Sequence, residues 1–513
     1  MKGKNRFQYI VFFIIVFFLG LMNMYGTESP SISLLVALTE YTIIFILLLT
    51  GDFSKAFFYY LAFSATILEF DLFIYGEDAS SHVRYSFAML PLFKDYLRWL
   101  LAYYFAFKAY EEYVAMKYKL SKTMTSLKKW LKLLFISGTI SITLALLFND
   151  NGVITNSNVY PEVAIFSILQ FLVKVSIILT SVFLLCREDW KEQCSIYIQL
   201  ILISVSLITV IAALLGFVGQ YNGKETILIA PLAVAYAPML ILFLFKRDEA
   251  VFPFITILSG LAAIIASLVY GGTAIGSKWY LIIILAILGV IVMLAKIRSL
   301  WMLFLGSVAC LMIVPLIILP VLSFFDVNSY AFVKLDQALT TINVFGFQNT
   351  AAWFAEIDES PLQRIDEVHN TLIEYYNKPW FAIFGKGFGG TTQHYTNLLS
   401  WSGLDQFSAD QIQMKAFYRM HETLAVILLQ NGIIGLMFFF KMIGKLLKRL
   451  YKTPLAMMAL VWFFFYWEYG ISLVIGSVIM VLALSEDIDS SPLKIKKKKI
   501  RKENYQNSEV INI

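Results

Sequence analysis

Long blocks of apolar residues recur along the chain, separated by shorter polar connections. Most blocks hold roughly 17–25 residues, which is the length that a helix needs to cross about 30 Å of hydrocarbon. A soluble protein with a buried core would instead show shorter amphipathic stripes. The pattern predicts fourteen membrane spans, at residues 7–25, 31–50, 56–75, 93–110, 131–149, 161–186, 196–218, 226–245, 252–271, 279–295, 299–325, 422–441, 453–467 and 470–485.

The composition agrees with this pattern, because 59% of the residues are hydrophobic and only 15% are charged. Soluble chains carry about 25% charged residues, so a soluble globular protein is excluded. Residues 7–25 follow a basic start, and no cleavage site of small residues comes after them. They are therefore predicted to be a signal-anchor and the first span. The predicted fold is an all-α polytopic membrane protein with about 12–14 transmembrane helices.

Lysine and arginine are distributed unevenly between the two sets of connections. Connections predicted to lie inside are rich in them, for example residues 117–129 and 441–452, whereas residues 149–160 on the other side carry none. By the positive-inside rule both termini are cytoplasmic; Arg84, Lys94 and Arg98 are the main exceptions. The predicted organisation is eleven spans in residues 1–325, a large extracytoplasmic loop at 326–421, further spans in 422–485 and a basic cytoplasmic tail at 486–513.

The last hydrophobic stretch, residues 454–484, is long for one span and short for two. The basic tail that follows it is predicted to be cytoplasmic, so the number of crossings must be even. A tight hairpin that turns near residues 467–470 satisfies this condition, and so does a re-entrant pair. The tail itself is interpreted as a disordered anchor to anionic lipid, with a partner-binding site as the alternative.

The large loop at residues 326–421 holds three of the four histidines, His369, His394 and His421; His82 is also predicted outside the membrane. Ser360-Pro361-Leu362-Gln363 is a helix start, with serine as the N-cap and proline in the first turn. Lys378-Pro379 ends this helix. Leu362, Ile365, His369, Leu372 and Tyr376 share its apolar face, with Arg364 and Glu367 on the polar side, so an amphipathic helix at the membrane interface is expected.

Residues 385–390, Gly-Lys-Gly-Phe-Gly-Gly, are termed the glycine turn. Gly385, Gly387 and Gly389 give its backbone the freedom to turn tightly and to approach a ligand, although turn geometry alone is the favoured interpretation. The spacing does not match a nucleotide-binding loop. A second helix start at residues 408–411 predicts a helix that runs through His421 into the next span, with Arg419 beside His421.

These residues together resemble the O-antigen polymerase/ligase superfamily, which includes the oligosaccharide repeat-unit polymerases. The resemblance lies in Arg364, Pro379-Trp380, the glycine turn, and His421 followed by Leu424, Leu428, Gly432 and Gly435. Ser277-Lys278 resembles the family's Ser-Arg-Gly element at the outer start of a span. Two positions depart from the pattern: Lys278 replaces an arginine, and Glu422 replaces the common asparagine. The resemblance covers about residues 255–440 and implies a GT-C-like helical bundle.

The resemblance implies transfer of a glycan from undecaprenyl pyrophosphate to a sugar hydroxyl, at the outer leaflet of a bacterial cytoplasmic membrane, without a metal, nucleotide or other cofactor. His421 and Arg364 would be catalytic, with His421 as the base, and direct displacement would invert the anomeric centre. Lys278 and Arg419 would bind the pyrophosphate. The implied partners are the lipid-linked oligosaccharide, membrane lipids, a chain-length regulator and a flippase, with no nucleic acid.

Three functions remain open at this point. A polymerase of lipid-linked repeat units for capsule, exopolysaccharide or O-antigen is favoured over a ligase that moves finished polymer to an acceptor. The third is a flippase or transporter, which would show inverted repeats and functional charges at the midplane. Each site residue also has a structural interpretation: His421 as an interfacial anchor, Arg364 as a headgroup contact, Lys278 as a span end and Arg419 as a partner of Asp410. Four charged residues lie at membrane depth: Glu40, Glu69, Asp71 and Lys174. Lys174 is expected to pair with a carboxylate, and a proton or ion pathway is the alternative.

Overall fold

The computed structural model is almost entirely helical over the residues that it describes. These are residues 3–26, 29–66, 97–147, 161–187, 190–216, 218–221, 224–227, 231–250, 252–270, 278–297, 299, 301–302, 304–306, 359–395, 417, 420, 423–467 and 474–485.

Apart from two helices in residues 359–384, the described helices overlap the predicted spans, while span 299–325 lies almost wholly outside the described residues. Several helices continue past the apolar block into its polar flank, because helical hydrogen bonding does not stop where the hydrophobic residues do. α5, for example, begins at Lys122 rather than at residue 131. The helices of the first part are α1 (Gly3–Gly26), α2 (Pro30–Leu49), α3 (Phe53–Ala65), α4 (Leu97–Ala115), α5 (Lys122–Leu147), α6 (Pro161–Leu184), α7 (Trp190–Leu215), α8 (Pro231–Leu240), the 3-10 helix η4 (Ile241–Glu249), α9 (Pro253–Tyr270) and α10 (Lys278–Ala295).

Within the described part of the chain, four helical segments are long and apolar enough to cross a membrane. Shorter apolar helices accompany them, so the chain has the character of an all-α membrane protein. The four segments are Phe7–Met24, Ser167–Leu184, Trp190–Leu215 and Thr423–Leu447.

A short antiparallel hairpin was not predicted. Strands β1 (Val218–Tyr221) and β2 (Lys224–Ile227) pair in the register that sets Tyr221 opposite Lys224. The two residues between the strands are Asn222 and Gly223, a dipeptide that is among the strongest sequence signals for a hairpin. The apolar block from residue 226 onward concealed this signal.

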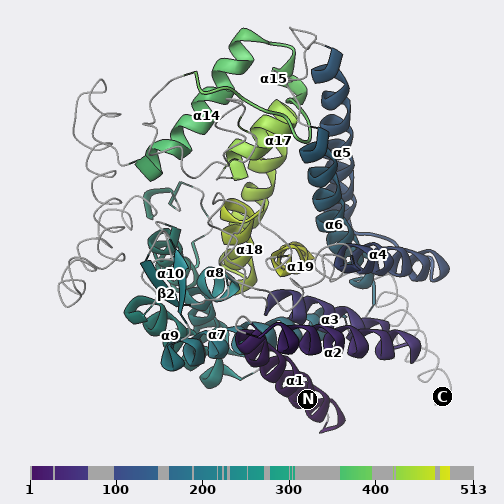
Figure 1. The fold of residues 1–513 in the computed structure, drawn as a ribbon, viewed down its shortest axis with the longest axis vertical. Coiled ribbons are helices and arrows are strands. Elements are labelled where there is room, and N and C mark those ends of the chain that lie inside the picture. The colour runs from purple at the N-terminus through teal and green to yellow at the C-terminus, as the bar shows by residue number, and fades with distance from the viewer. Residues whose placement is uncertain are drawn as a thin grey trace, which may run out of the picture.

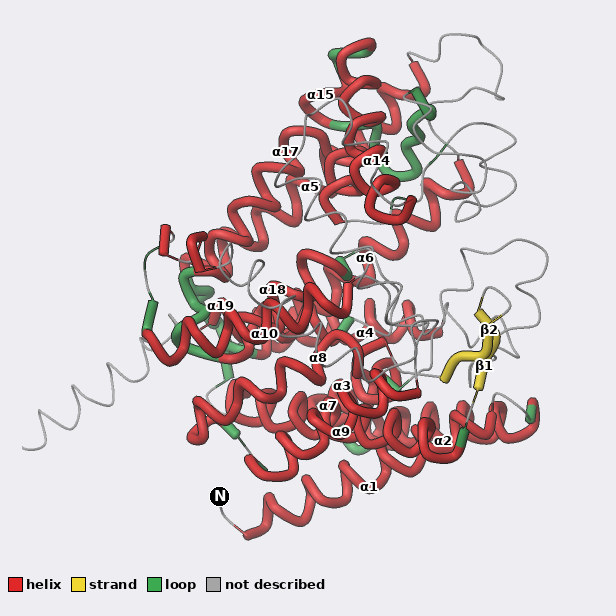
Figure 2. Tube along the Cα trace, turned by 90° about the vertical axis from the view of Figure 1, so that its left-hand side faces the viewer, coloured by secondary structure: helices red, strands yellow, loops and turns green. Residues whose placement is uncertain are grey.

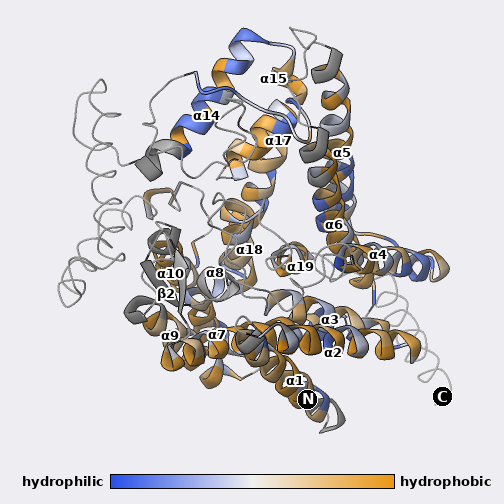
Figure 3. Ribbon diagram, in the orientation of Figure 1, coloured by the Kyte–Doolittle hydropathy of each residue, from blue (hydrophilic) through white to orange (hydrophobic). Residues whose placement is uncertain are grey.

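The second part of the chain contributes α14 (Glu359–Asn377), α15 (Phe381–Phe384), α17 (Thr423–Leu447), α18 (Pro454–Phe465) and α19 (Ile475–Leu484). Helices α1, α2, α3, α7 and α9 lie together at the lower end of the molecule (Figure 1). α5 and α17 lie above this group in Figure 1, and α14 and α15 pack against α17 and lie at its upper end in both views (Figure 2). α1, α2 and α9 are mostly hydrophobic in Figure 3, whereas α14 carries a marked hydrophilic stretch.

The two short helices α18 and α19 pack against each other, and the described side chains along both are almost all buried. Gly476 allows this approach, since a Cβ there would lie 2.0 Å from the Trp462 ring. With 12 and 10 residues, each helix is shorter than the roughly 20 residues that a full crossing needs. Two helices are therefore present in the last hydrophobic stretch, where a pair was predicted.

Buried charges occur among the apolar helices. The Lys174 ammonium donates to the carbonyl of Trp467 at 2.5 Å and lies 5.1 Å from the centre of the same residue's indole ring. Two candidates for its expected carboxylate partner, Glu69 and Asp71, lie outside the described residues, so that pairing stays a prediction. In α2, fully buried Glu40 accepts from the Asn23 amide at 3.2 Å. Arg98, an exception to the positive-inside rule, is buried as well.

Candidate functional site

Helix α17 is broken at Gly432, where φ is +57° and ψ is −141°. A residue with these angles interrupts the ladder in which each N–H reaches the carbonyl four residues earlier. The carbonyls just before Gly432 therefore need other donors, because unpaired backbone groups are costly in an apolar environment. Only glycine fits at this position, since a Cβ would lie 2.5 Å from the carbonyl oxygen of Ala382.

The donors come from the glycine turn and from α14. The backbone N–H of Lys386 donates to the Leu429 carbonyl at 2.7 Å, and that of Gly387 donates to the Gln430 carbonyl at 3.0 Å. The Tyr375 hydroxyl donates to the Leu429 carbonyl at 3.2 Å and also to the Leu428 carbonyl. The loop thus supplies the hydrogen bonds that the break removes from α17.

The three glycines with positive φ in the turn each face the backbone of a different helix. A Cβ on Gly385 would lie 2.4 Å from the carbonyl carbon of Gln430 in α17. The same test gives 2.5 Å from Gly387 to the Gly138 oxygen in α5, and 2.5 Å from Gly389 to the Ala164 nitrogen in α6. The glycines serve close packing against three helices, which supports turn geometry over ligand approach.

Side chains complete the docking of the turn. Phe388 is buried between α5 and α6, with its ring 6.3 Å from Phe135 and 5.2 Å from Phe171. The Ser141 hydroxyl donates to the Phe384 carbonyl at 2.8 Å. Beside the break, the Asn431 amide donates to the Leu134 carbonyl in α5 at 2.9 Å. The described part of the loop is therefore tied to the membrane helices through both backbone and side chains.

Helix α14 ends at Asn377, as predicted, but its polar side does not face water. Its polar side is buried: Asp366, Glu367, Asn370, Thr371 and Glu374 are each less than 5% exposed. The predicted apolar face is open, with Leu372 at 51% and Tyr376 at 87% exposed. The polar side turns inward because Lys386, His394 and Tyr395 lie there with complementary groups.

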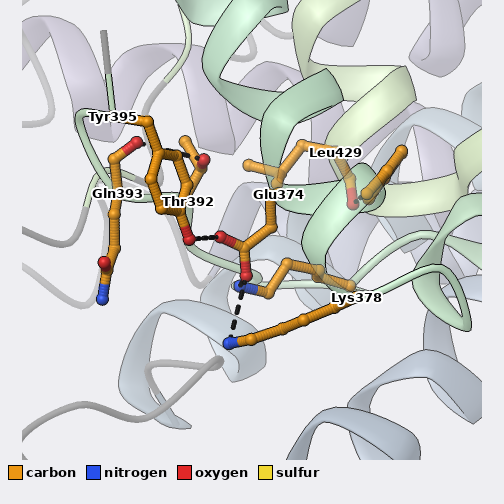
Figure 4. Close-up of polar contacts among 8 residues, drawn as sticks. Glu374, Lys378, Thr392, Gln393, Tyr395 and Leu429 are labelled. Atoms are coloured by element: carbon orange, nitrogen blue, oxygen red, sulfur yellow. Dashed lines mark hydrogen bonds and ion pairs between the residues drawn. The ribbon is translucent and has the colours of Figure 1, made fainter.

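Glu374 is the centre of the first buried cluster. The Lys386 ammonium lies 2.7 Å from its Oε1 and is 2% exposed, and the Lys378 ammonium lies 3.4 Å from the same oxygen. The Tyr395 hydroxyl donates to Oε2. Figure 4 shows Tyr395 and Lys378 approaching the carboxylate from different sides, with Leu429 of α17 nearby. Two lysines share one carboxylate, so this group of three carries one net positive charge.

The second cluster lies one and two helical turns earlier on the same face of α14. The Asn370 amide donates to Asp366 Oδ2 at 2.8 Å, and the backbone N–H of Tyr395 donates to the Asn370 side-chain oxygen at 2.7 Å. His394 Nε2 lies 2.9 Å from Asp366 Oδ2. Its ring meets Phe417 edge-on at 6.1 Å, and Phe417 pairs through its backbone with Thr392.

The stability of this loop should depend on pH through Glu374. Burial alone would raise the pKa of its carboxyl. Lys386, the Tyr395 hydroxyl and Lys378 together lower this pKa by more than burial raises it, so it falls below the ordinary 4.5. A depressed pKa in the folded state contributes stability that is present above the unfolded value and is lost as the pH falls through the folded one. Limited proteolysis of the loop in detergent should accelerate below about pH 4.5, and Glu374→Gln should remove this contribution to the acid step. An unchanged acid profile in that variant would contradict the assignment.

The residues predicted for the site are only partly described. Arg364 is half-buried near the start of α14 and makes interactions there. Lys278 is the first residue of α10, as expected for a span end, but its side chain lies outside the described residues. Arg419 and His421 lie outside them too, on either side of described and buried Met420. His369 is exposed on α14, whereas His394 contacts the buried carboxylate of Asp366.

Sequence reasoning missed the buried face of α14 and its partners, Lys386, His394 and Tyr395. A signal was present, because Asp366, Asn370 and Glu374 recur every four residues and so lie on one side of a helix. Their polarity was taken to mean exposure. Among the described residues there is no group of three or more His, Cys, Asp or Glu side chains that could hold a metal ion.

Three of the segments that carry the resemblance thus meet in space: the glycine turn is hydrogen-bonded to the stretch from Leu428 to Gly432, and α14 with Arg364 packs against α15 and α17. The arrangement offers a buried carboxylate with two lysines, and a histidine beside a buried aspartate. Comparison of the chain with protein-family models, with curated proteins and with solved structures gives no match.

Proposed function

We propose that the chain is a metal-independent, inverting glycosyltransferase with a GT-C-like bundle, which polymerises undecaprenyl-pyrophosphate-linked repeat units into capsule, exopolysaccharide or O-antigen at the outer leaflet of a bacterial cytoplasmic membrane. The sequence resemblance supplies the reaction class. The observation that carries the proposal is the interlock between the glycine turn and the broken α17. The glycine turn and the stretch around Gly432 are far apart in the sequence, yet they form one structural unit. This is expected if both motifs serve the same function.

The chemistry asks for positive charge near the leaving pyrophosphate and a proton acceptor near the attacking hydroxyl. Arg364, Lys278 and Arg419 are proposed to bind the pyrophosphate, and His421 is proposed to act at the start of α17. The lipid tail of the substrate would approach from the bilayer along the apolar helices. The exposed Leu372 and Tyr376 fit a helix α14 that rests on the membrane interface, since apolar side chains of such helices enter the headgroup region.

A transporter is the competing class, and the break in α17 is the feature that favours it. Transporters use the carbonyls of broken helices to coordinate ions. Here the carbonyls of Leu428, Leu429 and Gln430 already accept hydrogen bonds from the loop. The break is therefore used for docking, which favours the enzyme. A ligase shares the proposed machinery and differs in its acceptor.

The proposal is tested by Arg364→Ala and His421→Ala in a strain of the source organism that lacks the native gene. Loss of an acid–base group at His421 costs about 10²–10⁴-fold in rate, and loss of a positive charge at the leaving pyrophosphate costs about 10²–10³-fold. Long polymer should therefore be absent from both strains. Gel analysis of the surface polysaccharide and mass analysis of the lipid-linked pool are the measurements. His369→Ala is the matched control, because His369 is exposed on the same helix as Arg364.

The accumulating intermediate separates the functions. A polymerase defect leaves single repeat units on the lipid carrier at the outer face. A ligase defect leaves full-length polymer on the carrier, and a transporter defect leaves repeat units at the inner face. Normal polymer length and amount in both variants would show that the site assignment is wrong.

A further inference from the structure

His394 and Asp366 form a pair that the proposed function does not use. His394 Nε2 lies 2.9 Å from Asp366 Oδ2, and the side chain of Asp366 is 2% exposed. The histidine side chain is 13% exposed, so it remains partly open to the outside of the cluster. A buried carboxylate on one ring nitrogen and an accessible ring are the two parts of a histidine proton acceptor.

The aspartate is held in place by its own partners. The Asn370 amide donates to Asp366 Oδ2 at 2.8 Å, one helical turn along α14. The Asn370 oxygen in turn accepts from the backbone N–H of Tyr395, the neighbour of His394. The helix and the segment that carries the histidine are thereby fastened together around the pair, and the edge of Phe417 limits the ring from another side. The site has the fixed geometry that an acid–base group requires.

The position of the Asp366 carboxylate distinguishes the two ring nitrogens of His394. The contact is electrostatic in this geometry, because Nε2 makes no aligned hydrogen bond with a described residue. Nε2 is the ring nitrogen that faces Asp366, so Nδ1 is the nitrogen left to meet a substrate. The described part of the loop thus holds one histidine paired with a buried acid, whereas His369 is exposed on α14.

We propose that His394 accepts the proton of the attacking acceptor-sugar hydroxyl, with Asp366 as its positioning residue. This inference rests on the proposed function. The hydroxyl oxygen forms a bond to the anomeric carbon of the donor, and the bond from that carbon to the pyrophosphate oxygen breaks with its electron pair on the leaving group. The hydroxyl proton moves to Nδ1 and then to solvent. His394 then takes the role of proton acceptor that the resemblance assigned to His421.

The test uses full-length protein in detergent or membranes, with the lipid-linked repeat unit isolated from the deletion strain as substrate. His394→Ala should lower kcat by about 10²–10⁴-fold, whereas KM for the lipid-linked substrate should change little. Added imidazole should restore part of the lost rate, which a purely structural defect would not allow. Asp366→Asn should lower kcat without responding to imidazole, and His369→Ala is the matched control with normal kcat.

The possible results distinguish failure of this inference from failure of the proposed function. A wild-type kcat in His394→Ala, with polymer still formed, overturns the inference and leaves the proposed function intact. A correctly folded variant that loses activity without imidazole rescue also overturns it. If His394→Ala does not fold, His394→Gln keeps a polar group of similar reach and must show the same loss of kcat. Wild-type protein that forms no polymer from its natural substrate would instead refute the proposed function.

Discussion

Replacing Gly385 with alanine should unfold the loop and the upper part of α17 together. Gly385 has φ +81° and ψ −169°, a region open in practice only to glycine, and its new Cβ would lie 2.4 Å from the Gln430 backbone. Strain of this kind costs about 1–3 kcal/mol, and overpacking against a fixed neighbour costs about 1–3 kcal/mol more. The backbone cannot yield easily, because Lys386 and Gly387 hold the carbonyls of Leu429 and Gln430. Thermal unfolding in detergent should show a clear loss of stability.

Substitutions at two other glycines distinguish the cost of backbone strain from the cost of a steric clash. Gly51 has φ +78°, and no heavy atom lies within 4 Å of the place that a Cβ would occupy, so Gly51→Ala adds strain alone and should cost about 1 kcal/mol. Gly444 lies in α17 with open space around it, and Gly444→Ala should be neutral or stabilising by up to about 1 kcal/mol. If Gly385→Ala were no worse than Gly51→Ala, the contact between the turn and α17 would be wrong.

Removing charge from Glu374 should destabilise the loop more than removing either of its lysines. Glu374→Gln leaves Lys386 buried at 2% exposure without its counter-charge, and breaking a buried ion pair in this way costs about 3–5 kcal/mol. Lys386→Met should cost less, because Lys378 remains 3.4 Å from the carboxylate and compensates part of its charge. Lys378→Met should cost least, since that side chain is 19% exposed and its partner keeps Lys386. Unfolding of the purified variants gives the order.

The double variant Glu374→Gln with Lys386→Met supplies the control for this series. It removes both members of the pair, so no buried charge is left alone, and its stability should recover relative to Glu374→Gln. Strict additivity of the two losses would mean that the pair does not interact. Equal losses for Lys386→Met and Lys378→Met would contradict the difference in their burial.

The apolar helices could be predicted because the length of each apolar block indicates the length of its helix. The end of α14 at Asn377 followed from Lys378-Pro379, where the chain itself prevents further helix. The face of α14 could not be predicted in the same way. Whether Asp366 and Glu374 point to water or inward depends on Lys386 and His394, which reach them only after the chain has turned back. Local amphipathicity carries no information on such partners.

The glycine turn shows a different limit. A run of glycines predicts an unusual backbone, and the positive φ values at Gly385, Gly387 and Gly389 confirm that. Which helices this backbone contacts depends on the tertiary structure, and the turn lies against α5, α6 and α17. Gly432 was noted in the resemblance, but its role as the break that receives the turn depends on a partner more than 40 residues earlier. His421, Arg419 and the Lys278 side chain remain predictions.

The break in α17 has a consequence for biogenesis. A helix leaving the translocon normally carries its own backbone hydrogen bonds into the lipid, but α17 has carbonyls at Leu428, Leu429 and Gln430 that depend on donors elsewhere. Those donors, Tyr375, Lys386 and Gly387, precede α17 in the chain and so are synthesised first. Their segment is therefore complete before α17 is made, and we expect α17 to take its broken form only against the docked turn.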